Sequence, residues 1–532
     1  MDASPELAFP AAGFIGGGVG TEGSAMNHSP NRNVSSRTGF HRTAHDDDVM
    51  DPNQSGRKLA CGSLRSLRLG TSKRYRCAII AVLCTLSLLA NTAPQCTAQD
   101  NRGRIDAPTV QRAIGRGVEY LRKSQTDRGG WDEFPGQSCG LSSLCTLAWL
   151  NAGVSRNDPD MVRALNYLRR YEPTQTYAVS LQTLVFCHVG ALEDLPRIRR
   201  NVAWMAANQK TANSRNPGAW DYGDKEGGGD PSNSQFALLA LGEAVNRGVE
   251  VDPVVFQRAQ AYWRNLQLQR GGWPYRSIDP TGSMTCAGIG SLLIAQDALS
   301  TLDTDQKTLR CCDEQTDDPA IEKGFEFLTR IFTVETNPGS ALSSDFYYLY
   351  AIERVGRLSG RRLIGGHDWY REGAEHLVSL QDAFRGFWIG SGPAESKRDV
   401  ATSFALLFLS KGKRQVVVGQ LDHPTLRTLG ANNTASLPFS TSLKQLVRHV
   451  ERDWSQDLTW QTIQAEGATV ADLLRVPVIV IRGSQRIQFS NELVDTLEQY
   501  IDQGGTILFD AIGGDGCGDA SGFQASVIDL SQ

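Results

Sequence analysis

Two kinds of helical pattern alternate between residues 105 and 413. The first is amphipathic, as in residues 110–124, where the apolar side chains recur at helical spacing; this is typical of a helix on the outside of a protein. The second is apolar or small on every side, which is typical of a buried helix. Six stretches have this second pattern: 141–152, 178–189, 234–245, 286–298, 346–355 and 402–410. The pattern predicts six helix pairs, each with an outer and an inner member.

A short motif follows four of the amphipathic stretches. It contains a glutamine, then a glycine, and a tryptophan two residues after that glycine. Its copies are Gln125 with Gly129 and Trp131, Gln209 with Gly218 and Trp220, Gln267 with Gly271 and Trp273, and Gln381 with Gly386 and Trp388. Glycine permits positive φ where a helix ends, and the tryptophan offers a large ring that packs on the next helix. Two degenerate copies begin near Tyr167 and Phe327. Repeats of this length predict stacked helix pairs that close into a double ring.

The copies resemble the glutamine–tryptophan (QW) repeats of the terpenoid cyclase and protein prenyltransferase β-subunit superfamily, which includes the squalene cyclases. The resemblance covers residues 105–413 and implies a mainly α fold, an α/α toroid of six helix pairs. It leaves the activity open, because this fold carries cyclases, zinc prenyltransferases and non-catalytic modules.

A squalene-hopene type cyclase protonates its substrate with an aspartate of an Asp-x-Asp-Asp motif, which residues 105–413 do not contain. The candidates for an acid in the ring are Asp221 and Asp230, both weak. Asp230 stands at the start of an inner helix, where an aspartate commonly caps the helix N-terminus. Asp221 lacks a second carboxylate that would tune its pKa.

A protein prenyltransferase of this superfamily binds zinc through an Asp and a Cys two residues apart on one inner helix and a His on a later one. The matching positions are Met284, Cys286 and Ala401. One ligand of three cannot hold a catalytic zinc. We expect no metal and no cofactor, and the lack of both motifs favours a protein that is not an enzyme.

Six aromatic residues near the glycine turns are weak candidates for ligand binding. They are Trp131, Trp220, Tyr222, Trp273, Tyr275 and Trp388. At the mouth of a ring, such side chains would bind a sugar, a lipid or a peptide. The alternative, favoured for the tryptophans, is that they are wedges between neighbouring repeats.

Strand patterns appear after residue 413. Residues 415–419, 478–481 and 506–509 read as strands, and residues 443–451 and 491–502 as helices. Strand, helix and strand in succession predict a small α/β domain with a parallel sheet over residues 414–532.

This region resembles the domain of unknown function DUF4159. The resemblance rests on residues 453–454, 458–460, 481–483, 489–490 and 500–506. It implies a flavodoxin-like fold related to the class I glutamine amidotransferases. Where those enzymes place a nucleophile after a strand, the candidate here is Cys517. Only 15 residues follow it, too few to supply the His and Glu that activate such a cysteine. We expect an incomplete domain without amidase chemistry.

The first 75 residues are rich in Gly, Ser, Asn and Asp and predict a disordered region. Basic residues between 57 and 76 precede an apolar run at 77–90, the order found in a signal peptide. The run is shorter than the roughly 20 residues that span a bilayer. Residues 76–98 are therefore either a cleaved signal peptide or a retained signal anchor, with membrane association through 77–90 in the second case. Both predict a periplasmic or cell-envelope location, and Met50 is a candidate start.

The charge of the chain excludes one class of function. The chain has 54 Lys+Arg against 58 Asp+Glu. It therefore has no basic domain of the kind that binds nucleic acids. We expect an exported envelope protein whose toroid binds a hydrophobic, carbohydrate or protein ligand. The alternative is a divergent cyclase-like enzyme that acts on a polyprenoid or another hydrophobic substrate, and a third possibility is a scaffold for the α/β domain.

Overall fold

The structure is a computed structural model. It describes residues 105–223, 227–275, 278–303, 318–341, 343–423, 440–454, 458–483, 485–511 and 520–530. These residues belong to one compact unit that spans residues 104–532. The predicted disordered region (1–75), the predicted export segment (76–98) and Cys517 lie outside the described residues.

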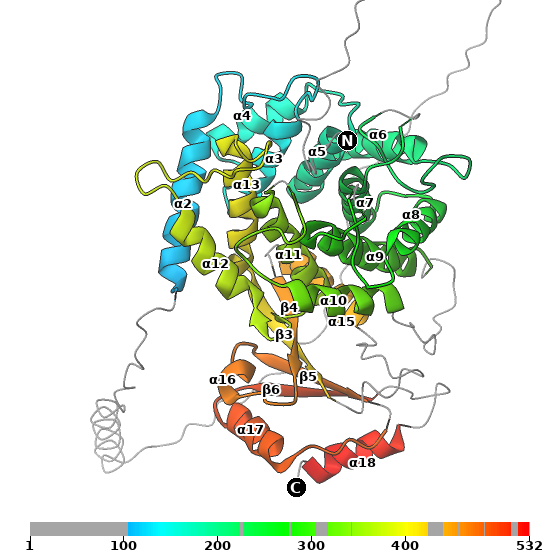
Figure 1. Cartoon of the computed structure of the whole chain (residues 1–532). Coiled ribbons are helices and arrows are strands. Elements are labelled where there is room, and N and C mark those ends of the chain that lie inside the picture. The colour runs from blue at the N-terminus through cyan, green and yellow to red at the C-terminus, as the bar shows by residue number, and fades with distance from the viewer. Residues whose placement is uncertain are drawn as a thin grey trace, which may run out of the picture. The chain divides into compact units, whose positions relative to one another are not determined.

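Six inner helices form a closed ring (Figure 1). They are α3 (Gly140–Asn151), α5 (Thr176–Val189), α7 (Pro231–Asn246), α9 (Gly282–Asp303), α11 (Asp345–Ser359) and α13 (Arg398–Leu409). Each inner helix packs against the next, and α13 packs back against α3. The outer helices are α2 (Ala107–Ser124), α4 (Pro159–Leu168), α6 (Leu195–Asn208), α8 (Pro253–Leu266), α10 (Pro319–Ile331) and α12 (Trp369–Leu380). The predicted toroid of six helix pairs is confirmed.

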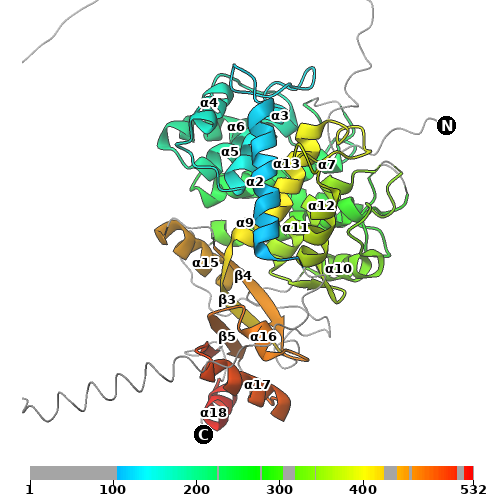
Figure 2. The ribbon, with the colours of Figure 1, turned by 90° about the vertical axis from the view of Figure 1, so that its left-hand side faces the viewer.

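The two sets of helices are buried as their sequences predict. Outer helix α2 buries one face, made by Val110, Ala113, Ile114, Gly117 and Leu121. Inner helix α3 buries every residue from Gly140 to Leu150. The first and last pairs meet where α2 lies against α12 and α13 (Figure 2). Burial of apolar surface therefore holds the ring together along its whole circumference.

The four motif copies make the same hydrogen bonds. Each indole N–H donates to a backbone carbonyl in the preceding outer helix: Trp131 to Leu121 at 3.0 Å, Trp220 to Met205 at 2.7 Å, Trp273 to Trp263 at 2.7 Å and Trp388 to Leu377 at 2.7 Å. Each glutamine amide donates to its own turn and to a carbonyl of the next outer helix. The last of them, Gln381, reaches the carbonyl of Ala113 in α2 at 2.9 Å, so the same bond closes the ring.

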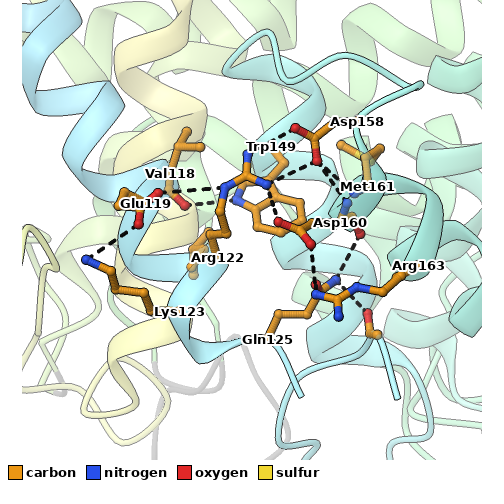
Figure 3. Close-up of polar contacts among 12 residues, drawn as sticks. Val118, Glu119, Arg122, Lys123, Gln125, Trp149, Asp158, Asp160, Met161 and Arg163 are labelled. Carbon is orange, nitrogen blue, oxygen red and sulfur yellow. Dashed lines mark hydrogen bonds and ion pairs between the residues drawn. The ribbon is translucent and has the colours of Figure 1, made fainter. Parts of the chain in front are cut away.

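Charged contacts also join neighbouring outer helices. Figure 3 shows Arg122 of α2 directed at Asp158 and Asp160, where α4 begins. Arg264 of α8 makes the equivalent contact with Asp318 at the start of α10, at 2.8 Å. Asp158 and Asp318 are also the N-caps of their helices. One carboxylate thus satisfies free backbone N–H groups and joins two repeats.

The C-terminal part contains a four-stranded parallel sheet in the order β4-β3-β5-β6. The strands are β3 (Gln415–Asp422), β4 (Leu458–Gln464), β5 (Val478–Gly483) and β6 (Thr506–Ala511). Helix α15 (Ser440–Trp454) covers one face, where Leu443 and Val447 pack with Trp460. The other face carries a separate apolar cluster, contributed partly by α16 (Val470–Leu473), α17 (Asn491–Asp502) and α18 (Ser521–Leu530). The predicted small parallel α/β domain is confirmed.

Candidate functional site

One end of the ring collects the N-termini of the inner helices. Each outer helix leads through a turn into the inner helix of its pair, so that all six inner helices run in the same direction. We call the end formed by these turns the turn face. Helix N-termini carry free backbone N–H groups and a partial positive charge. The turn face therefore requires acceptors, which the turns themselves provide.

Three carboxylates of the turns cap inner helices. Glu133 accepts from the backbone N–H groups of Leu141 and Ser142 at 2.8 and 3.1 Å, at the start of α3. Asp230 is the N-cap of α7, as predicted. Glu395 accepts from the backbone N–H of Tyr347 at 2.8 Å, at the start of α11. Glu133 and Glu395 are not among the site residues predicted from the sequence.

Burial changes the acidity of these side chains. The pKa of Glu133 is raised to about 7 and that of Glu395 to about 8, because the effect of burial is larger than the opposing effect of the hydrogen bonds from backbone N–H groups. Burial also raises the pKa of Asp399, in the first turn of α13. The turn face thus holds carboxyl groups that keep a proton at a pH where exposed carboxyl groups are ionised.

Asp230 makes further bonds beyond its helix. Its Oδ1 accepts from the hydroxyl of Ser232 at 2.5 Å and from the backbone N–H of Asn233 at 2.8 Å. Its Oδ2 accepts from the hydroxyl of Tyr275 at 2.6 Å. Asp230 is buried. The structure therefore brings together two candidates from the sequence, Asp230 and Tyr275, in one hydrogen-bonded group.

Asp221 serves its own turn. Its carboxylate accepts from the backbone N–H of Tyr222 at 2.9 Å and from that of Gly229 at 3.0 Å. These bonds hold together the two ends of the loop that precedes α7. Tyr222 is half-buried, and its ring centroid lies 5.9 Å from that of Tyr177 in α5.

Aromatic side chains fill space between inner helices. Tyr177 of α5, Phe236 of α7, Tyr347 and Tyr350 of α11 and Phe404 of α13 are all buried. Their ring centroids are 5.3 to 6.5 Å apart in successive contacts, the range in which aromatic rings attract one another. We call these five residues the aromatic centre. In the sequence, the aromatic run within residues 346–350 is the local feature that points to this cluster.

The four motif tryptophans lie in the wall of the ring. Their side chains are at most 3% exposed. Each backbone N–H donates to the hydroxyl oxygen of a serine or threonine in the following inner helix: Trp131 to Ser142, Trp220 to Ser234, Trp273 to Thr285 and Trp388 to Thr402. Each tryptophan thus joins the outer and inner helix of its own pair. This placement is that of a wedge between helices.

The positions equivalent to zinc ligands are packed into the ring. Met284, Cys286 and Ala401 are all buried, and burial raises the pKa of the Cys286 thiol well above its usual range. Within the described residues, no group of three His, Cys, Asp or Glu side chains is placed to hold a metal ion. None of the helices that the structure describes combines the length and apolar character needed to cross a membrane.

Residues 426–529 match the family model of DUF4159, a domain of unknown function. The type II terpene cyclase MstE from Scytonema (apo) is a similar solved structure, 13% identical, covering 57% of this chain and 99% of its own, with a TM-score of 0.41. The Candida albicans protein geranylgeranyltransferase-I complexed with GGPP is 11% identical and covers 65% of this chain and 99% of its own, with a TM-score of 0.36. No curated protein matches.

Proposed function

We propose that the protein is a non-catalytic binding protein, in which the turn face of the toroid receives a partner protein. The observation that carries this proposal is the aromatic centre. Its five buried rings contact one another and occupy space between the inner helices. A long hydrophobic substrate would need room in this space. A closely packed interior is costly to open, so binding at the surface is favoured over chemistry inside the ring.

Exposed apolar side chains on the turn face support a protein partner. Phe384 and Ile389 lie in the turn before α13, and Ile278 lies in the turn before α9. Phe384 is 99% exposed and Ile278 is 86% exposed. A partner that covers these side chains removes their apolar surface from water, and a large side chain buried in this way anchors an interface. Since they belong to different turns, they suit an extended protein surface better than a small molecule.

The finer predictions from the sequence form part of this proposal. The predicted export segment at 76–98 would place the partner in the periplasm or cell envelope. We also propose that the fold of the C-terminal domain is related to that of the class I glutamine amidotransferases, and that the domain has no amidase activity. The second candidate function is a divergent cyclase; the hydrogen-bonded Asp230 and Tyr275 supply its specific observation.

Substitution of the exposed apolar residues tests the proposed binding face. The tagged chain is isolated from its own cells after chemical cross-linking. We expect the unsubstituted chain to retain a partner protein, and the chain with both Phe384→Ser and Ile278→Ser to lose it. The control is Leu192→Ser. Leu192 is 82% exposed but lies in the short helix between α5 and α6, at the other end of the ring. Equal retention by all three chains would contradict the proposed face.

A further inference from the structure

The end of the ring opposite the turn face carries charged side chains. The inner helices end there, and they contribute Glu243 from α7, Asp297 from α9 and Arg357 from α11. The Asp297 side chain is only 10% exposed. Charges at low exposure require partners, because the removal of an ion from water is costly.

Helix α15 supplies partners for Asp297. Lys444 Nζ lies 3.1 Å from Asp297 Oδ2, and Arg448 Nη1 lies 2.7 Å from the same oxygen. Lys444 and Arg448 are four residues apart and therefore share one face of α15. Leu443 and Val447, also four apart, pack against the sheet instead. α15 thus joins the C-terminal domain by its apolar face and the ring by its charged face.

The two acids at this end, Asp297 and Glu243, stay ionised despite their burial. Burial favours the neutral form of Asp297, but Lys444 and Arg448 outweigh it and hold the pKa of Asp297 below its ordinary value. The pKa of Glu243 is lowered in the same way, since Arg448, Arg357 and Arg354 outweigh the effect of burial. Arg448 therefore acts on acids from two inner helices.

The other side of the C-terminal domain meets the ring differently. Strand β3 begins directly after α13 and the short helix η4 (Ser410–Lys413), so the chain itself links ring and sheet there. The backbone N–H of Thr462 in β4 donates to the carbonyl of Gly360 at 2.8 Å. The ring of Trp460 lies so close to Gly360 that a side chain there would collide with it. An ion pair also lies here, between Arg362 and Asp472 of α16 at 2.8 Å. What distinguishes this side is therefore the covalent connection between ring and sheet.

We propose that the C-terminal domain is a hinged cover on this end of the ring, held closed by the ion pairs of α15. The hinge is the side where Gly360 meets Thr462. The side of α15 is the releasable one, because α9 and α15 are not consecutive in the chain and Asp297 is held there by ion pairs. Charges that separate regain their hydration, which offsets much of the lost attraction. This cover lies at the end of the ring away from the turn face and is independent of the proposed partner.

Charge reversal in the full chain, followed by amide hydrogen exchange, tests the cover. We expect Arg448→Asp to speed exchange about tenfold or more in peptides from α15 and from the last turns of α9, since one buried charge loses its partner and a like charge meets Asp297. The control is Arg371→Asp, an equal change of charge at an exposed side chain of α12, which should leave these peptides unchanged. Arg448→Lys, which keeps the positive charge beside Asp297, should retain much of the protection.

The comparison of peptides separates opening from unfolding. Opening predicts faster exchange only at the covered end, with peptides of α4 and α5 as protected as before. If Arg448→Asp speeds exchange throughout the ring, the milder variant Arg448→Gln is measured instead, with the same expected result and the same contradicting result. Exchange in α15 and α9 equal to that of the unsubstituted chain, or an Arg448→Lys variant that loses as much protection as Arg448→Asp, would overturn the hinged cover.

Discussion

Trp273→Ala is expected to lower the free energy of unfolding of the ring by about 3–5 kcal/mol. Trp273 has no exposed surface, and its ring packs so closely on Gly288 and Gly324 that a side chain at either glycine would collide with it. Alanine would leave a large cavity and remove the indole N–H that donates to the Trp263 carbonyl. Urea unfolding of the full chain, followed by circular dichroism, measures the change.

Phe384→Ala is the matched control for this prediction. It also removes a large aromatic side chain next to a turn of the ring, but one that is exposed, and surface changes of this kind shift stability by about 0.5 kcal/mol or less. Similar losses for the two variants would mean that Trp273 is not a wedge, and the account of the repeat would fail.

Gly218→Ala is expected to lower the free energy of unfolding by about 3 kcal/mol. Gly218 has a φ of 88°, a conformation that costs energy for any residue with a Cβ. A Cβ at this position would also overlap the carbonyl oxygen of Arg258 in the next outer helix. The turn would therefore have to move away from α8, and the bond from Gln209 to α8 would weaken with it.

Gly248→Ala separates the two causes of that loss. Gly248 has a φ of 73°, but no atom lies within 4 Å of the position that its Cβ would take. Only the backbone strain applies, and we expect a loss of about 1–2 kcal/mol. The same unfolding measurement compares the two. A loss for Gly218→Ala no greater than that for Gly248→Ala would contradict the close approach of turn and helix.

The parts of the fold that repeat could be predicted from the sequence. Gln267, Gly271 and Trp273 act within one turn and on the next helix, so that their spacing along the chain reflects their spacing in the structure. Asp230 could be assigned as an N-cap for the same reason, since a cap acts on residues that follow it directly.

The contacts between distant segments could not be predicted. Glu395 caps a helix that begins 50 residues earlier in the chain, at Asp345, and no local pattern marks such a partner. The pairing of Asp297 with Arg448 joins residues 151 apart. The aromatic centre depends on which faces of α5, α7, α11 and α13 meet, and that follows from the closure of the ring.

The central claim is that the interior of the ring is filled and that the protein binds at its surface. The most direct test is to incubate the full chain with squalene and, separately, with geranylgeranyl diphosphate, and then to record native mass spectra and analyse the extracted lipids. The account predicts no bound lipid and no new product. A complex that is lost in Phe404→Trp, which overfills the aromatic centre, or a cyclised product that is lost in Asp230→Asn, would contradict it and favour the cyclase.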